Sequence, residues 1–274
     1  MSTIVITGSS SGMGKATAKF FAKKGWTVVA TMRSPEKETE LLAYDNVHLY
    51  PLDITNVEQV KSASQSILGK YDVDVLFNNA GYGMKAKFED MTENAMKRSI
   101  DTNVLGMIRV TQQFIPFFKR KKGGLILTTT SLAGEMGLVM DGVYAADKWA
   151  VTGMCEMLYF ELAPYHIRVK TIVPGVVQTG FKMDGGGATP EEYEEIIGRQ
   201  VEFLMPGGDH TQMETAQEAA QDIWDAVNDP DDDRMCYVTG KRAKEIYAKR
   251  QTMGDEDFRR YYRSLILGRQ GEQY

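Results

Sequence analysis

The chain has 274 residues, of which 43% are hydrophobic and 25% charged, as is ordinary for a soluble globular protein. A formal net charge of −5 argues against a nucleic-acid-binding protein. No apolar run approaches the roughly 18 residues that a membrane-spanning helix needs, and no secretion leader precedes the first apolar run. The two cysteines, Cys155 and Cys236, show no metal-ligand spacing. We therefore expect a reduced, cytoplasmic protein without a metal, membrane or nucleic-acid partner; a single disulfide is the alternative.

Seven short apolar runs, rich in β-branched residues, recur along the chain, and amphipathic stretches separate the first six. Such runs are typical of strands buried on both faces of a parallel sheet. Their alternation with helices predicts an α/β fold with a doubly wound, mainly parallel seven-stranded sheet and helices on both faces. The predicted strands cover residues 3–7, 27–31, 47–50, 73–77, 125–130, 167–173 and 235–239, and the predicted helices cover 14–24, 35–44, 57–70, 92–120 and 144–165.

Two regions depart from this alternation. Residues 176–213 are long and irregular, carry several glycines and contain one candidate helix at 190–200. An insertion of this length is more often a functional lid than a simple connection, so we expect a substrate lid within a single domain of residues 1–240. Residues 241–274 are rich in Lys, Arg and Tyr, and we expect them to form a helical C-terminal tail.

A glycine-rich loop with the spacing Gly-x-x-x-Gly-x-Gly follows the first strand directly and leads into a helix. Glycine allows a tight turn and a close approach of a pyrophosphate to the backbone, and the helix N-terminus stabilises the anion. A flexible turn at a helix start is the alternative, but the position after the first strand favours dinucleotide binding. The residues predicted to contact the cofactor here are Gly8, Ser10, Ser11, Gly12, Met13 and Gly14.

The end of the second strand bears on the choice of cofactor. An NAD site usually has an acidic residue there to bind the ribose 2′-hydroxyl, and this strand ends without one. Arg33 follows instead and could bind a 2′-phosphate by a charge-assisted hydrogen bond. A solvated surface arginine is the alternative. We therefore predict that NADP(H) is preferred, with NAD(H) as the second option.

Tyr144 and Lys148 form a Tyr-x-x-x-Lys element in a predicted helix, where residues four apart share a face. A cation near a phenol lowers its pKa, which yields an acid/base for a carbonyl or an alcohol. Alone, such a pair is most often a surface pair. Here several polar and glycine motifs follow the predicted strands at the edge where ligands bind in an open α/β sheet. They are Asn78 to Gly81, Ser131, Pro174 with Gly175, and Thr179, with Asn103 in the helix between the first two.

With Thr7 and Asp53, these motifs resemble the short-chain dehydrogenase/reductase family, in its shorter single-domain branch, over roughly residues 3–179. The resemblance implies a Rossmann-like fold and reversible hydride transfer between NAD(P) and an alcohol or carbonyl. It implies that Tyr144 exchanges the proton, that Lys148 lowers its pKa and binds the nicotinamide ribose, and that Ser131 orients the reacting oxygen of the substrate. Asn103 would position a water that links Lys148 to solvent. Further cofactor contacts implied are Asp53, Ile54, Asn79, Ala80, Gly81, Tyr144, Lys148, Pro174, Gly175, Val177 and Thr179.

Methionines and aromatic residues cluster after Ser131, after Gly81 and in the lid, so we predict an apolar substrate; filling of core gaps is the alternative for these side chains. The 34 residues beyond Gly240 argue against the family's standard tetramer. We expect a homodimer through helices 92–120 and 144–165, with a tetramer as the alternative. The rival functions are a dinucleotide-binding redox sensor without turnover and, ranked last, a sugar-nucleotide epimerase or dehydratase.

Overall fold

A parallel sheet forms the centre of the computed structural model, which describes residues 2–181, 183–184, 190–208 and 213–269. Its strands follow the order β3-β2-β1-β4-β6-β7-β11, and every pairing is parallel. The strand order reverses between β1 and β4, which is where open α/β sheets bind ligands. The prediction of a doubly wound seven-stranded sheet is confirmed. The strands are β1 Thr3–Thr7, β2 Thr27–Met32, β3 Val47–Pro51, β4 Val75–Asn78, β6 Gly124–Thr129, β7 Ile167–Pro174 and β11 Cys236–Thr239.

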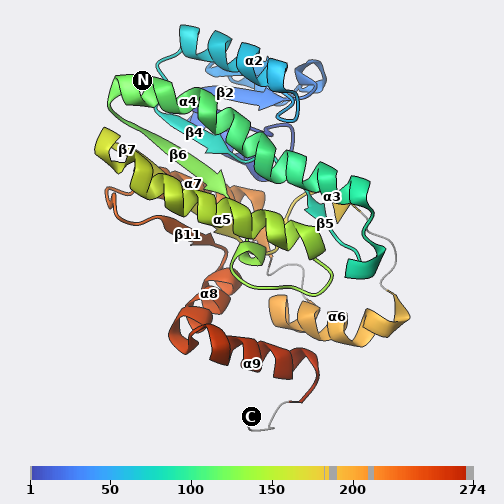
Figure 1. The fold of residues 1–274 in the computed structure, drawn as a ribbon. Helices are drawn as coiled ribbons and strands as arrows, with labels where there is room; N and C mark the ends of the chain where they lie inside the picture. Colours follow the sequence, from blue (N-terminus) through green and yellow to red (C-terminus); the bar gives the residue numbers. More distant parts are fainter. Residues whose placement is uncertain (1, 182, 185–189, 209–212, 270–274) are drawn as a thin grey trace.

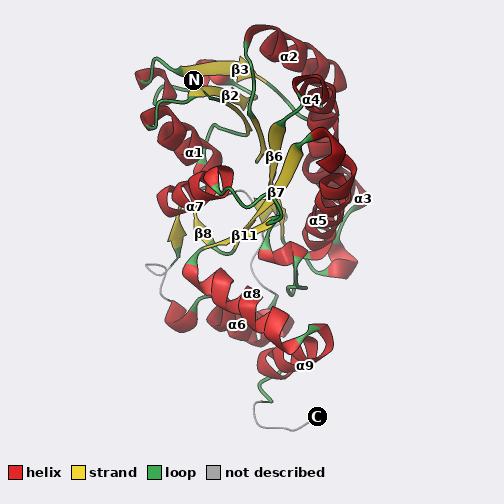
Figure 2. Cartoon of the chain, turned by 90° about the vertical axis from the view of Figure 1, so that its left-hand side faces the viewer, coloured by secondary structure: helices red, strands yellow, loops and turns green. Residues whose placement is uncertain are grey.

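Helices cover both faces of the sheet (Figure 2). On one face, α1 (Gly12–Lys23) packs against α7 (Ala216–Asn228). On the other face lie α2 (Val57–Lys70), α4 (Met107–Lys121) and α5 (Gly142–Leu162). Successive residues of a strand pack against opposite helix layers, since side chains along a strand point alternately to the two faces of the sheet.

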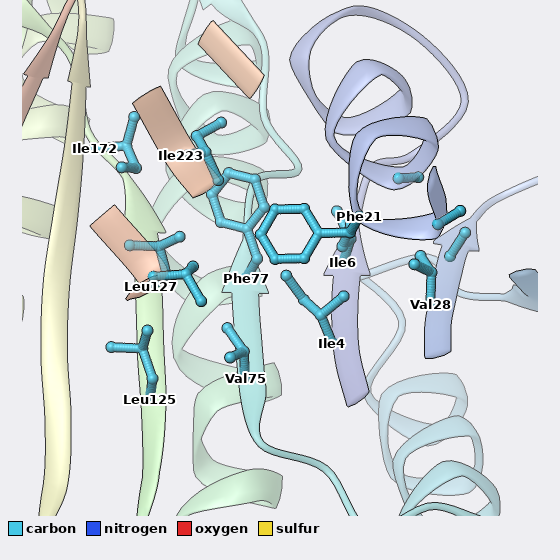
Figure 3. Packing of buried hydrophobic residues seen from close by; sticks show 14 of the residues in the cluster. Ile4, Ile6, Phe21, Val28, Val75, Phe77, Leu125, Leu127, Ile172 and Ile223 are labelled. Carbon is cyan, nitrogen blue, oxygen red and sulfur yellow. The ribbon is translucent and has the colours of Figure 1, made fainter. Parts of the chain in front are cut away.

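The core beneath α1 and α7 shows how this alternation works. Ile4 and Ile6 of β1 point toward Phe21 of α1 and Phe77 of β4, and none of the four is exposed to solvent (Figure 3). Val5, between the two isoleucines, packs instead into the cluster beneath α2, α4 and α5. Burial of both faces explains why the strands are continuous apolar runs.

The helix predicted over residues 35–44 is wrong. The chain forms two short 3₁₀ turns there, η1 (Pro35–Lys37) and η2 (Leu41–Ala43). Between them the buried carboxylate of Glu38 accepts backbone N–H groups of Glu40 at 2.8 Å and Leu41 at 3.0 Å. These side-chain bonds replace helical backbone bonds, and so they end the first turn.

The helix predicted over residues 92–120 has a change of geometry inside it. It begins as α3 (Glu93–Ile100), widens to the π-helical turn η4 (Asp101–Gly106) and continues as α4. Such turns are frequent at functional sites. Gly106 ends this turn, and a Cβ there would lie 2.7 Å from Ile54 Cδ1, so the turn packs closely on the loop after β3.

The lid and the tail lie together beyond the carboxyl edge of the sheet, with α6, α8 and α9 as neighbours (Figure 1). Two-residue strand pairs join the lid to the rest of the chain: β8 (Val177–Gln178) with β10 (Glu214–Thr215), and β9 (Met183–Asp184) with β5 (Gly83–Met84). Residues 182, 185–189 and 209–212 of the predicted lid lie outside the described residues. The helices are α6 Glu191–Leu204, α8 Lys241–Met253 and α9 Asp255–Ile266, and the remaining 3₁₀ turns are η3 Phe88–Asp90, η5 Leu132–Gly134, η6 Ala163–Tyr165 and η7 Pro206–Gly208.

None of the helices described is both long and apolar enough to cross a membrane. The division of the chain into a domain of residues 1–240 and a separate tail stays a prediction.

Candidate active site

The glycine loop between β1 and α1 requires glycine for two different reasons. Gly8 and Gly12 have φ angles of +70° and +55°, a region that side chains rarely adopt. Gly14 has no room, because a Cβ there would lie 2.4 Å from the carbonyl oxygen of Gly8 and 2.5 Å from Asn79 Nδ2. The loop is therefore compressed against the chain after β4.

Hydrogen bonds fix this contact between the two strand ends. Thr7 Oγ1 accepts the N–H groups of Asn79 at 2.9 Å and Ala80 at 3.0 Å. The Asn79 side chain donates in return to the carbonyl oxygens of Thr7 at 3.0 Å and Gly8 at 3.2 Å. The predicted neighbourhood of the glycine loop and residues 79–81 is present in the structure.

The first turn of α1 is open to an anion. Its N-cap, Ser11, makes no side-chain capping bond, and no acidic residue lies in the turn. The first N–H groups of a helix have no partner within it and attract negative charge. Ser10 is exposed, and Met13 lies within the turn itself. This turn and the compressed glycines fit the pyrophosphate of a dinucleotide.

Arg33 lies at the carboxyl end of β2 and is exposed. Within the described part of the chain no carboxylate forms an ion pair with it, whereas Lys15 nearby is bound by Glu38 at 3.0 Å and Glu40 at 2.9 Å. On the neighbouring strand end, Asp53 Oδ1 accepts the N–H of Thr55 at 2.9 Å.

Ser131, Tyr144 and Lys148 converge beyond the end of β6. Ser131 follows that strand, its side chain acts on the Tyr144 hydroxyl by lowering the pKa of the phenol, and its Oγ accepts the N–H of Ala133 at 3.1 Å. Lys148 Nζ donates to the carbonyl oxygen of Thr129 at 2.8 Å and lies 5.7 Å from the centre of the Tyr144 ring. The helical Tyr-x-x-x-Lys spacing thus places both groups against the end of the same strand.

Burial has the largest effect on the pKa of both Tyr144 and Lys148. It raises the pKa of Tyr144, while the neighbouring Ser131 side chain acts in the opposite direction. Burial also lowers the pKa of Lys148 to about 8, against the attraction of Asp147. The expected lowering of the Tyr144 pKa is therefore not found here, because desolvation of the phenolate is the larger effect.

Asn103 lies in the π-helical turn and is buried. Its side chain forms two bonds with the backbone of Tyr82: it donates to the carbonyl oxygen at 3.0 Å and accepts the N–H at 3.1 Å. It also leaves no room for a side chain at Gly81, where a Cβ would lie 2.9 Å from Asn103 Oδ1. Asn103 thus holds the loop that follows Ala80.

The remaining predicted cofactor residues end β7 and begin the lid. Thr179 lies beside the glycine loop, since a Cβ at Gly12 would lie 3.4 Å from its Cβ. Gly175, after Pro174, faces the tail instead, and a Cβ there would lie 2.8 Å from Ala243 Cβ. Val177 pairs with Glu214 in the β8–β10 ladder.

The apolar residues predicted to line the substrate site divide into two groups. Met84 packs in one cluster with Tyr144, and the Phe181 ring lies 6.2 Å from the Tyr144 ring, so these border the phenol. Met136 and Phe203 are buried in another cluster with the tail, where they fill core space. The core-filling alternative therefore holds for this second group.

A buried amide connects the lid to the segment between Ser131 and Tyr144. Gln200 of α6 accepts the N–H of Val139 at 2.7 Å and donates to its carbonyl oxygen at 3.3 Å. The hydroxyl of Tyr262 in α9 donates to the same Gln200 oxygen at 2.6 Å. The tail, the lid and the segment between Ser131 and Tyr144 therefore meet at the Gln200 side chain, a contact we call the Gln200 junction.

The sequence model of the family described as "short chain dehydrogenase" matches residues 2–187 of this chain. The chain belongs to the short-chain dehydrogenase/reductase family of NAD(P)-dependent oxidoreductases. The match covers the glycine loop, Asn103, Ser131, Tyr144 and Lys148, and it ends within the lid.

Curated relatives and solved structures agree with this family. A 3-ketodihydrosphingosine reductase of Bacteroides thetaiotaomicron is 35% identical over 65% of this chain and 65% of its own length, so the chain spans just under two thirds of that relative. A short-chain dehydrogenase structure from Streptomyces avermitilis superposes with a TM-score of 0.81 at 27% identity, over 92% of each chain. An alcohol dehydrogenase from Thermococcus sibiricus, complexed with 5-hydroxy-NADP, gives 0.72 at 27% identity, over 88% of this chain and 96% of that one.

Two buried polar residues next to this short-chain dehydrogenase site were not predicted. Asp147 and Ser99 are hydrogen-bonded to each other and to Asn103. A signal for Asp147 is present in the sequence, because a residue three positions after Tyr144 shares its helix face. Ser99 lies one helical turn before Asn103 and shares its helix face by the same rule.

Proposed function

We propose that this short-chain dehydrogenase interconverts an apolar ketone and its secondary alcohol, with NADP(H) as the preferred cofactor. The observation that carries the proposal is the convergence of Ser131, Tyr144 and Lys148 at the end of β6, beside the glycine loop. A protein that only sensed the dinucleotide would have no need of a proton donor in this position.

In this mechanism the cofactor supplies or takes up the hydride when it is bound. The Tyr144 hydroxyl donates its proton to the carbonyl oxygen during reduction and accepts it back during oxidation. Ser131, whose side chain already acts on that hydroxyl, holds the reacting oxygen next to it. The Lys148 ammonium favours the phenolate that remains after proton transfer.

Replacement of Tyr144 by phenylalanine tests the proton transfer. We expect Tyr144→Phe to bind NADPH with unchanged affinity, measured by nicotinamide fluorescence, and to lose at least about 100-fold in kcat, the usual contribution of a general acid. Tyr165→Phe is the matched control, because Tyr165 is exposed and lies in η6, beyond the end of α5. Turnover retained in Tyr144→Phe would contradict the mechanism.

The NADP(H) preference is supported by Arg33, which is exposed and unpaired with any described carboxylate, and by the absence of an acidic residue at the end of β2. The similar alcohol dehydrogenase from Thermococcus sibiricus also binds an NADP derivative. A 2′-phosphate would form a charge-assisted bond with this arginine.

Substitution of Arg33 tests this preference. We expect Arg33→Ala to weaken NADPH binding by about tenfold, the loss of one charge-assisted bond, and to leave NADH binding unchanged. Lys37→Ala is the control, because Lys37 is exposed in the turn that follows. Tighter binding of NADH than of NADPH by the unsubstituted protein would reverse the assignment.

The apolar substrate is supported by the side chains that border Tyr144, which include Met84 and Phe181. The relative from Bacteroides thetaiotaomicron is named as a reductase of a keto compound. A panel of ketones of increasing chain length, assayed by NADPH consumption, should show kcat/KM rising with apolar surface. Equal rates across the panel would count against an apolar site.

We also propose a homodimer through the surface of α4 and α5. Trp149, Met157 and Phe160 on α5 are 46%, 47% and 66% exposed, which is unusual for large apolar side chains on one helix. Light scattering should give twice the chain mass of 30.7 kDa, and Phe160→Asp should shift the protein toward the monomer.

A further inference from the structure

Asp147 is a carboxylate inside the active-site helix, with an exposure of only 1%. It immediately precedes Lys148 and lies one helical turn after Tyr144. Burial of a carboxylate costs several kcal/mol unless other groups compensate it. Buried charged groups in a cleft are therefore candidates for functional residues.

Neutral donors bind one oxygen of this carboxylate. Asp147 Oδ2 accepts the Ser99 hydroxyl at 2.6 Å and the Asn103 side-chain amide at 2.9 Å. Asp147 Oδ1 is buried and finds no hydrogen-bond partner among the described residues. Burial raises the pKa of Asp147, whereas the bonds from Ser99 and Asn103 and the charge of Lys148 favour the ionised carboxylate.

This network determines the orientation of Asn103. The two hydrogens of its amide nitrogen are directed to the carbonyl oxygen of Tyr82 and to Asp147, with a longer contact of 3.3 Å to Ser99 Oγ. Its amide oxygen is then left to accept the N–H of Tyr82. An amide has only two donor hydrogens, so Asp147 and the Tyr82 carbonyl together account for both.

The charge of Asp147 also acts on the groups assigned to proton transfer. It raises the pKa of Lys148, against the larger effect of burial, and it adds to the rise in the pKa of Tyr144. The other titratable groups that act on these two are Asp141 on Tyr144 and Cys155 on Lys148, while Ser131 lowers the pKa of Tyr144. Burial raises the pKa of Tyr82, and the charges of Asp147, Asp184 and Arg98 act on that pKa as well.

We propose that Asp147 is a positioning residue of this active site, which fixes the Asn103 amide against the loop at Tyr82 and supplies the negative charge that keeps Lys148 an ammonium. The proposal rests on the proton-transfer function proposed for Tyr144. Its two parts, orientation and charge, come from the same carboxylate and can be separated by substitution.

The isosteric variant Asp147→Asn removes the charge and retains an oxygen that can accept the bonds from Ser99 and Asn103. Both Lys148 and Tyr144 should then lose protons at lower pH, because the charge of Asp147 favours the protonated form of each. We expect the alkaline limb of the pH profile of kcat/KM for carbonyl reduction to shift down by about one pH unit. Below that limb the variant should keep its activity to within about threefold.

Ser99→Ala is the matched control, because it removes a hydrogen bond to the same carboxylate and leaves the charge in place. Its alkaline limb should stay within about 0.3 pH unit of that of the unsubstituted protein. Identical limbs in Asp147→Asn and the unsubstituted protein would overturn the proposal, and so would equal shifts in Asp147→Asn and Ser99→Ala.

Ultraviolet difference titration keeps the proposal testable without any turnover. Subtraction of the Tyr144→Phe spectrum isolates the ionisation of Tyr144, which should occur at lower pH in Asp147→Asn than in the unsubstituted protein. Where Asp147→Asn does not fold, Asp147→Ser provides the same comparison. A protein without turnover but with the shifted titration would refute the proposed function and support the role of Asp147.

Discussion

The strand edge, formed by the glycine loop and the ends of β1, β4 and β6, is held differently from the described parts of the lid (residues 176–213) and of the tail (residues 241–274). At the strand edge, buried side chains such as Thr7 and Asn79 bond to backbone atoms, and glycines leave no spare volume. The lid is attached by two-residue strand pairs, by the buried Gln200 side chain and by exposed ion pairs such as Arg98–Asp184. We infer that the region assigned to the chemistry is rigid, whereas the region assigned to recognition can adapt.

The largest effect is expected at the strand edge. A Cβ at position 14 would strike the backbone of Gly8, so Gly14→Ala must move the glycine loop. We expect a loss of at least about 100-fold in NADPH affinity, equivalent to about 2.7 kcal/mol, measured by calorimetry. Gly69→Ala in α2 is the control, because a Cβ there meets no atom within 4 Å, and it should stabilise the protein slightly. Unchanged affinity in Gly14→Ala would show that the loop is not rigid.

A smaller effect is expected where the lid joins the sheet. Burial raises the pKa of Glu214 in β10 to about 7, and its Oε1 is buried without a hydrogen-bond partner among the described residues. Because the folded chain binds this proton more tightly than the unfolded chain, stability should fall as pH rises from about 5 to about 8. In Glu214→Gln the melting temperature should depend less on pH over this window. An equally steep dependence in the variant would place the titrating group elsewhere.

Loss of one hydrogen bond at the Gln200 junction should change recognition more than chemistry. Tyr262→Phe removes the donor to Gln200 and is expected to raise KM by about three- to tenfold, since a buried hydrogen bond contributes about 1 kcal/mol. The kcat should change less than KM, because Tyr144 and Ser131 are untouched. Tyr261→Phe is the neighbouring control, since no described residue hydrogen-bonds its hydroxyl. A fall in kcat with unchanged KM would mean that the lid and tail act on the chemistry itself.

The smallest effect is expected from the ion pairs on the lid surface. Arg98 and Asp184 lie 3.2 Å apart with exposures of 60% and 44%. Exposed pairs contribute about 0.5 kcal/mol, so Arg98→Ala should change KM by less than about threefold. Lys97→Ala, which breaks a pair within α3, should leave KM unchanged. A tenfold rise in KM for Arg98→Ala would show that the lid is held more tightly than its contacts suggest.

The same contrast explains what could be predicted from the sequence. The strands could be predicted because burial on both faces makes each strand an apolar run, whereas their order in the sheet was not predicted. Sequence patterns also predict the site residues. Helix periodicity places Tyr144 and Lys148 on one face, and Ser131 follows a strand end. The two-residue pairs β5–β9 and β8–β10 have no periodicity to detect, and the 35–44 segment follows a helical pattern that Glu38 interrupts through its own hydrogen bonds. The Asp147 network and the Gln200 junction depend on contacts between distant segments, which no local pattern records.

The π-helical turn at residues 101–106 closes its hydrogen bonds between residues i and i+5, so it holds one residue more than an α-helical turn. Removal of one residue from this turn should restore a regular α-helix and keep Phe114 and Phe118, which are 1% and 0% exposed, in the interior. Asn103 lies within the turn and would lose its place beside Tyr82. A deletion at this point would therefore act on the loop after Ala80 and spare the core beneath α4.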